Sequence, residues 1–137
     1  MIAVIFEVEP AAGKRDAYLG VAAELRPLLD GIDGFISIER FQSLSHPDRV
    51  LSLSFWRDEE AVKTWRNMEE HRAAQSAGRS GIFENYRLRI AHVMRDYGMR
   101  ERAQAPEDSR CVHDRSRPHA LPISMPVAKT SAPPSTT

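Results

Sequence analysis

The sequence predicts an α+β domain in which two helices cover one face of a four-stranded antiparallel sheet. The first observation is the order of hydrophobic periods along residues 2–98, which alternate between strand-like and helix-like spacing as βαββαβ. That order is the split βαβ, or ferredoxin-like, arrangement. The second observation is that the strands carry large apolar residues on both faces, although helices would cover only one. A homodimer joined through the other sheet face is therefore expected, because a two-fold interface lets one patch cover itself.

The first strand and the first helix are distinguished by the spacing of their apolar residues. Residues 2–9, IAVIFEVE, are rich in β-branched side chains and begin apolar on both faces, which suits a strand in the middle of a sheet. Pro10 and Gly13 interrupt this strand, and helical spacing of apolar residues begins after Lys14. The helical positions are Tyr18, Val21, Ala22, Leu25, Leu28 and Leu29. The helix is expected to kink or end near Pro27.

Two antiparallel strands are predicted to follow as a hairpin. FISIERFQSL, residues 35–44, alternates between two faces, and VLSLSFW, residues 50–56, is its partner. Residues 45–48, Ser-His-Pro-Asp, have the composition of a turn. Trp56 ends the second of these strands and is expected to pack in the core or at its rim, since large aromatic side chains are mostly buried.

The second helix is predicted to begin at Asp58, whose carboxylate is a good N-cap. In an unbroken helix Trp65 and His71 would border one packed face from its two margins, about 120° apart. Asn67 offers an alternative, because asparagine tolerates the left-handed conformation of a helix end and residues 69–77 would then form a second short helix. In both cases the side chains of Trp65 and His71 are expected to point toward the sheet from the same short segment.

The last strand is predicted at residues 86–98, YRLRIAHVMRDYG. One face carries Leu88, Ile90, His92 and Met94, and the other carries Arg87, Arg89, Ala91, Val93, Arg95 and Tyr97. Arginines on such a face usually mark a solvated sheet edge or ion pairs between subunits, although one of them is able to clamp an anionic ligand.

Composition excludes several classes of partner. Lys plus Arg and Asp plus Glu both number 19, so there is no net field to recruit nucleic acid or an anionic membrane. The single cysteine rules out an intramolecular disulfide, and no segment has the order of a signal peptide or the length of a membrane span. We therefore expect a cytoplasmic protein that binds neither nucleic acid nor membrane.

The chain is predicted to divide into a folded domain, residues 1–102, and a tail, residues 103–137. Six of the nine prolines lie in the tail together with many Ser and Thr and no aromatic residue. Such a segment buries too little apolar area to offset its ordering entropy, so it is expected to be disordered or to wrap a partner. Cys111, His113 and His119 are metal-ligand types, but a zinc site wants four ligands in a fixed frame, and no metal site is predicted.

Residues 51–79, LSLSFWRDEEAVKTWRNMEEHRAAQSAGR, followed by residues 84–98, ENYRLRIAHVMRDYG, resemble the antibiotic biosynthesis monooxygenase domain family, in particular its small stand-alone bacterial members. GFISIERFQS, residues 34–43, supports the resemblance, which covers residues 1–98. It implies a ferredoxin-like fold that dimerises into an α/β barrel with a pocket between sheet and helices. Some members of this family oxygenate aromatic phenols or quinols with O2 and no metal or flavin, and others degrade haem.

The resemblance implies a cofactor-independent monooxygenase that takes a small aromatic substrate. Trp65 and Asn67 are expected to bind and orient that substrate. His71 is the expected base, since imidazole is well poised to take a phenol proton near neutral pH. Tyr86 or Arg89 is expected to hold a substrate oxygen. The plainer interpretation is that Trp65 only packs and that His71 is a half-buried residue satisfied by a neighbouring carboxylate or by solvent.

Two alternatives to this function remain open at the level of sequence. The haem-degrading branch of the family uses an axial histidine and an asparagine on the first strand. Here residues 2–10 contain no asparagine, and His71 comes one turn before the family's histidine position, near Ala74 and Gln75, so haem is disfavoured. The second alternative is a non-catalytic dimeric module that binds a small molecule, because fold alone does not imply function.

Overall fold

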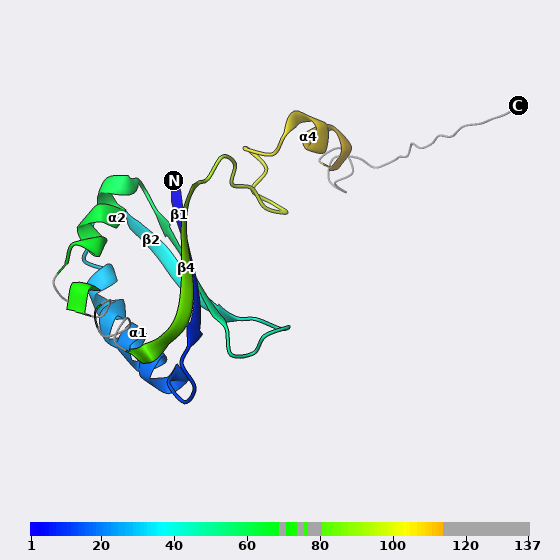
Figure 1. Cartoon of the computed structure of the whole chain (residues 1–137). Helices are drawn as coiled ribbons and strands as arrows, with labels where there is room; N and C mark the ends of the chain where they lie inside the picture. The colour runs from blue at the N-terminus through cyan, green and yellow to red at the C-terminus, as the bar shows by residue number, and fades with distance from the viewer. Residues whose placement is uncertain (69–70, 74–75, 77–80, 114–137) are drawn as a thin grey trace, which may run out of the picture. The chain divides into compact units, whose positions relative to one another are not determined.

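The computed structural model describes residues 1–68, 71–73, 76 and 81–113 (Figure 1). Residues 1–93 form one compact unit, and the chain from Met94 onward forms another. The elements are β1 (Ile2–Pro10), α1 (Arg15–Leu29), β2 (Phe35–Gln42), β3 (Val50–Trp56), α2 (Glu59–Arg66), β4 (Phe83–His92) and α4 (Glu107–His113). None of the helices among the described residues is long and apolar enough to cross a membrane.

The first unit is a four-stranded antiparallel sheet with strand order β2-β3-β1-β4. As the apolar character of its first strand predicts, β1 lies inside the sheet, between β3 and β4. Figure 1 shows α1 and α2 on the same side of this sheet, which we call the helix face. The predicted ferredoxin-like α+β fold is thereby confirmed, whereas the homodimer stays a prediction.

The last strand begins earlier and ends earlier than the sequence predicted. β4 starts at Phe83, because β1 continues to Pro10 and offers it a partner there. It ends at His92, which pairs with Ile2, the first residue of β1. An apolar alternation continues in sequence to Tyr97, but no residue of β1 is left to pair with it.

Strand β2 departs from simple alternation at its start. The register with β3 shifts between Phe35 and Ser37, so that Phe35 pairs with Trp56 and Ile38 pairs with Ser54. The extra residue, Ile36, is 52% exposed. Phe35 packs edge-on against Trp56, with ring centroids 5.2 Å apart. The extra residue reverses which side chains face the core from that point on. Phe35 and Ile38, three positions apart, therefore both pack against the core.

Helix α2 is capped as predicted and ends before His71. Asp58 Oδ1 accepts a hydrogen bond from the Ala61 amide at 3.0 Å, the arrangement of an N-cap. The helix ends at Arg66, and Asn67 follows with φ −95°, in the right-handed and not the left-handed region. Residues 71–73 are helical again. Residues 69–70, where the second short helix was expected to begin, lie outside the described residues.

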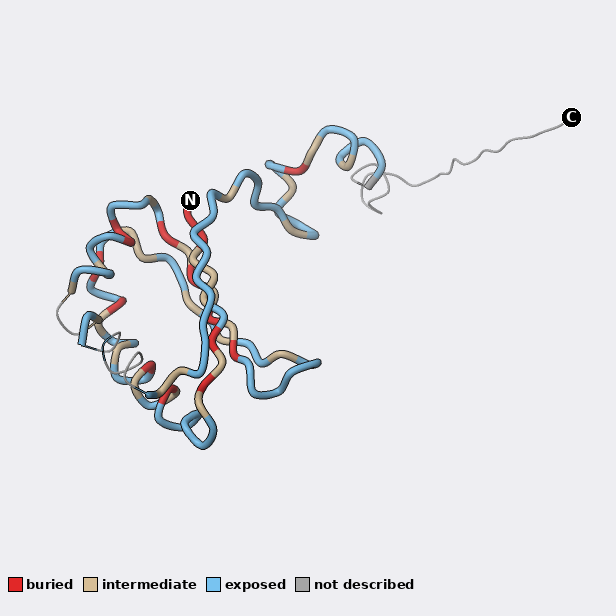
Figure 2. The backbone as a smooth tube through the Cα atoms, viewed as in Figure 1, coloured by how far each residue is buried: buried red, intermediate tan, exposed pale blue. Residues whose placement is uncertain are grey.

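The core on the helix face is split into two clusters. The first, which we call the Trp56 cluster, consists of Ile2, Leu29, Ile32, Trp56, Ala61 and Val62. The second, the Tyr18 cluster, consists of Val8, Tyr18 and Val50. Figure 2 shows the buried stretches on β1 and β3 and on the inner sides of the helices, whereas β4 is mostly exposed.

Small side chains separate the two clusters at the centre of the sheet. On β3, Ser52 and Ser54 stand between Val50 and Trp56 on the helix face and are only 7% and 5% exposed. A serine fills far less volume than the leucine or valine usual at such positions. The helix face is therefore packed at both ends and left unfilled in the middle.

Gly34 sets the approach of α2 to the sheet, and we expect its replacement by alanine to be destabilising. Its φ is +96°, and a Cβ there would lie 2.8 Å from Ala61 Cβ. Gly34→Ala combines backbone strain with a clash against the first turn of α2, so the free energy of unfolding is expected to fall by roughly 2–4 kcal/mol. The measurement is the midpoint of urea denaturation.

Gly13 is a matched control for that substitution. It too has a positive φ, +76°, but nothing lies within 4 Å of a Cβ built on it. Gly13→Ala therefore reports backbone strain alone, about 1 kcal/mol. Equal losses at the two positions would show that the contact with Ala61 contributes nothing.

The second unit is a small folded segment within the described residues 94–113. Arg102 donates to the Gly98 carbonyl and to Ser109 Oγ, both at 3.1 Å, and its guanidinium lies over the Tyr97 ring. Helix α4 falls inside the region from residue 103 that the sequence predicted to be a tail. Cys111 is exposed, and among the described residues no group of three or more metal-ligand side chains is found. Residues 114–137, including His119, lie outside the described part.

Candidate active site

A cavity of about 220 Å³ occupies the unfilled centre of the helix face. Its walls are mostly apolar: Val4 and Phe6 of β1 form the floor, and Val21 and Leu25 of α1 form the opposite side. Leu88 and Ile90 of β4, which are 48% and 43% exposed, line it from the edge strand. Apolar walls around a few convergent polar groups are the usual composition of a small-molecule site.

Besides the hydroxyls of Tyr18 and Tyr86, five polar side chains interrupt the apolar lining. They are Arg40, Ser52, Ser54, Arg66 and His71. Among the described residues of the lining, His71 is the one aspartate, glutamate or histidine, so it is the natural candidate for proton transfer. The other charged members are the two arginines, and guanidinium groups do not lose their proton in proteins.

His71 is held by Trp65 in two ways. The two rings stack with centroids 4.5 Å apart and an interplanar angle of 16°. In addition, His71 Nδ1 lies 3.1 Å from the Trp65 carbonyl oxygen. A carbonyl only accepts hydrogen bonds, so Nδ1 carries the proton in this contact. The neutral imidazole is thereby fixed in the tautomer whose Nε2 is an acceptor.

The pKa of His71 is lowered from its ordinary value of 6.5. The larger cause is burial, which disfavours the charged imidazolium, and the hydrogen bond to the Trp65 carbonyl opposes it. The neutral form, with its free acceptor at Nε2, is therefore the form present at neutral pH.

The end of α2 at Arg66 explains this contact. In a continuous helix Trp65 and His71 would stand on opposite margins of one face. Because the regular helix stops, the chain brings His71 back over Trp65, whose carbonyl oxygen also accepts from the Met68 amide at 3.2 Å. The ring stacking was not predicted from spacing.

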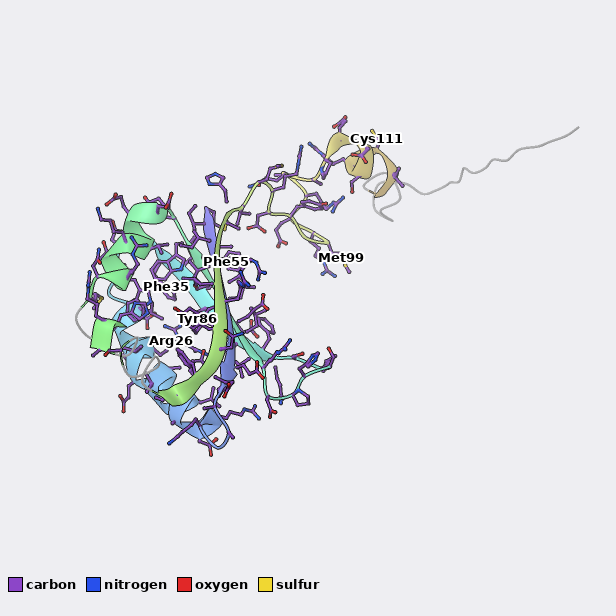
Figure 3. All side chains as sticks on the ribbon, viewed as in Figure 1. Arg26, Phe35, Phe55, Tyr86, Met99 and Cys111 are labelled. Atoms are coloured by element: carbon purple, nitrogen blue, oxygen red, sulfur yellow. The ribbon has the colours of Figure 1, made fainter. Side chains whose placement is uncertain are left out.

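Of the other residues named from the sequence, Tyr86 lines the cavity, and Asn67 and Arg89 do not. Tyr86, which is labelled in Figure 3, is 44% exposed, and its ring centroid lies 5.6 Å from that of Phe6. Asn67 is exposed, and its Oδ1 accepts from the Arg72 guanidinium. Arg89 sits on the sheet face away from the helices, where it pairs with Glu7 at 2.6 Å.

Arg40 is a lining residue that the sequence reasoning missed. It follows Ile38 by two positions on β2, so the two side chains point to the same face of the sheet. The sequence did offer one signal for it: a charged side chain stands on the strand face that otherwise carries apolar residues. Another arginine of this face, Arg26 of α1, lies over the Phe35 ring, with its Cζ 5.4 Å from the ring centroid. Both residues are labelled in Figure 3.

Among the described lining residues there is one histidine, His71, and no asparagine, and the expectation that haem is disfavoured stays a prediction. A pocket filled by Met68, Phe83 and Trp65 would have favoured a module without chemistry, but the described side chains leave the centre open beside His71.

The sheet face away from the helices also carries apolar side chains. Ile5, Leu51, Leu53 and Phe55 are partly exposed there, and Phe41 is 43% exposed. This is the surface through which the sequence predicts a homodimer. The homodimer itself stays a prediction.

Comparison with known proteins gives three kinds of match. A sequence model of the family described as antibiotic biosynthesis monooxygenase matches residues 1–77. A jasmonate monooxygenase of Pyricularia oryzae is 50% identical over 93 residues, which are 68% of this chain and 43% of that protein. An uncharacterized protein of Bacillus subtilis is 36% identical over 62 residues, 45% of this chain and 53% of that protein. The chain thus spans about half the length of the curated relatives it matches.

Solved structures agree at the level of the fold. The crystal structure of a putative antibiotic biosynthesis monooxygenase from Deinococcus radiodurans superposes with a TM-score of 0.65, over 72% of this chain and 97% of that one. The sequence identity is 13%, so the likeness concerns the fold alone.

Proposed function

Because the chain belongs to the antibiotic biosynthesis monooxygenase family, we propose that it is a monooxygenase that oxidises a small aromatic phenol or quinol with O2 in the cavity of the helix face. The observation that carries this proposal is the arrangement of His71. Its Nδ1 is occupied by the Trp65 carbonyl, so its Nε2 is left as a proton acceptor at the wall of an apolar cavity.

In the proposed reaction the substrate supplies all the electrons. His71 Nε2 takes the phenol proton, and the resulting phenolate is electron-rich enough to react with O2 at a ring carbon. One oxygen atom stays on that carbon as a new carbonyl. The other leaves as water with the two hydrogens lost from the phenol O–H and the ring C–H. Phenol and O2 thus give quinone and water, in a four-electron exchange that needs no added reductant.

The cavity favours this chemistry through its surroundings. Apolar walls exclude water from the anion, and the low polarity strengthens the interaction between phenolate and protonated His71. Trp65 keeps the imidazole ring in one plane by stacking, and Tyr86 offers an aromatic side to the substrate ring. In this proposal the chain needs no metal, flavin or haem of its own, and Asn67 and Arg89 take no part.

The test is oxygen uptake by the purified full chain with a panel of one- and two-ring phenols, in the presence of a metal chelator. We expect equal molar amounts of O2 consumed and quinone formed, and no hydrogen peroxide. The methyl ether of each phenol is a matched control, since it has the same rings and no proton to give. A requirement for flavin, metal or reductant, or turnover of the ethers, would exclude the proposed reaction.

The pH dependence of kcat/KM follows from the lowered pKa of His71. The base is active when neutral, so activity is expected to decline as pH falls through the lowered pKa, with the midpoint of the acid limb under 6.5. Folding stability should change in the same sense. The unfolded chain binds the His71 proton more readily, so stability declines as pH falls below 6.5. An acid limb centred above pH 6.5 would contradict the assignment of His71 as the base.

A further inference from the structure

Arg40 places a positive charge in the wall of the cavity, and no ion pair joins it to another described residue. Its Nε is buried and has no hydrogen-bond partner among the described residues. The ion pairs of the described part involve other arginines, such as Arg57 with Asp33 and Arg89 with Glu7. Within the described ranges Arg40 is therefore a half-buried guanidinium with no acidic partner.

Such an arrangement is unfavourable for the chain on its own. A buried donor without an acceptor loses its hydration and gains nothing in return, and a charged donor loses more than a neutral one. The chain nevertheless holds Arg40 at this position by pairing β2 with β3, where Arg40 stands opposite Ser52. An acceptor that enters the cavity would satisfy the group.

The neighbouring residues extend this polar region along the floor. Ser52 and Ser54 lie beside Arg40 in the lining. Ser54 Oγ accepts a hydrogen bond from Trp56 Nε1 at 2.9 Å, which leaves the Ser54 hydroxyl hydrogen free to be donated. A guanidinium with hydroxyl donors nearby matches the flat, doubly accepting shape of a carboxylate.

We propose that Arg40 binds a carboxylate of the ligand, so that the cavity selects small aromatic acids over neutral molecules of the same shape. The apolar walls hold the rings, and the polar region at Arg40 fixes which end enters first. This inference rests on the cavity used in the proposed function, but it requires no reaction with O2.

The experiment is isothermal titration calorimetry of the full chain with two probes, 2-naphthoate and 2-naphthalenemethanol. They differ in charge and share one ring system. We expect the naphthoate to bind more tightly, and Arg40→Gln to weaken its binding by about 10–100-fold while changing alcohol binding little. Arg40→Lys should retain part of the preference, because it keeps the charge and loses the Nε donor.

Two controls separate Arg40 from other cations. Arg89→Gln removes a guanidinium from the opposite sheet face and should leave both affinities unchanged. Arg66→Gln removes the other arginine of the lining. If Arg66→Gln and not Arg40→Gln abolishes the preference, or if the native protein binds both probes equally, the inference is wrong.

Thermal unfolding without ligand distinguishes a binding role from a structural one. Replacing an unsatisfied charge by an apolar chain of similar length should not destabilise the empty protein, so Arg40→Met is expected to raise Tm by about 2–5 °C. A lowered Tm would show that Arg40 supports the fold, and would overturn the inference. Failure of O2 uptake with intact, Arg40-dependent naphthoate binding would instead count against the proposed function alone.

Discussion

Replacing His71 with alanine is expected to lower turnover of a phenol substrate by about 10²–10⁴-fold, the usual contribution of a positioned general base. The reason is the fixed tautomer. Nδ1 is engaged by the Trp65 carbonyl, and Nε2 is the acceptor left at the cavity wall. Substrate binding should change much less, because the apolar walls supply most of the contact. Steady-state kinetics of O2 uptake would therefore show the loss in kcat and little change in KM.

Two further variants, His71→Asn and His92→Ala, separate proton transfer by His71 from other effects of replacing a histidine. Asparagine at position 71 is able to donate to the Trp65 carbonyl, but it does not accept a proton, so its turnover should be as low as that of the alanine variant. His92 is exposed at the end of β4 and does not line the cavity, and its replacement should leave turnover unchanged. Turnover retained by His71→Asn would show that His71 positions the chain and does not move a proton.

Replacing Trp56 with alanine is expected to lower the free energy of unfolding by about 3–5 kcal/mol. Trp56 is 1% exposed and is the largest fully buried side chain of the described residues. It anchors the cluster that joins β3 to both helices and packs against Phe35. Urea denaturation followed by circular dichroism would measure the loss.

Two further substitutions show which part of this loss of stability is specific to Trp56. Trp56→Phe keeps an aromatic ring and removes the Nε1 donor to Ser54, so it should cost less than the alanine change. Trp65→Ala is the matched test at a half-buried tryptophan, where a smaller loss of stability is expected together with reduced turnover, because His71 loses its stacking partner. If Trp65→Ala proved as destabilising as Trp56→Ala, Trp65 would belong to the core and not to the site.

The order of the elements and their caps were readable from sequence because they depend on local rules. Hydrophobic period distinguishes strands from helices, and the Asp58 cap follows from one side chain and the amide of Ala61 three residues later. The limits of β4 were not readable in this way. They are set by the length of β1, its partner, which lies about eighty residues earlier in the chain.

The candidate site was only partly predictable for the same reason. Trp65 and His71 could be named from residue type and the family resemblance, but their stacking depends on where α2 stops. Arg40 was missed because the local signal, a positive charge at an inward strand position, does not by itself show a cavity: that cavity is formed with Ser52 across the strand pair and with residues of the helices. Arg89 was named for its charge, and its pairing with Glu7 depends on register.

The division of the core into two clusters has a consequence for how such a protein diversifies. Ser52 and Leu88 line the cavity and belong to neither cluster. A substitution at either position reshapes the binding space without removing a contact from the groups that hold sheet and helices together. Substitutions at the centre of the sheet therefore change the stability of the fold little. A scaffold of this kind is able to acquire new ligand preferences through single substitutions that selection for stability does not oppose.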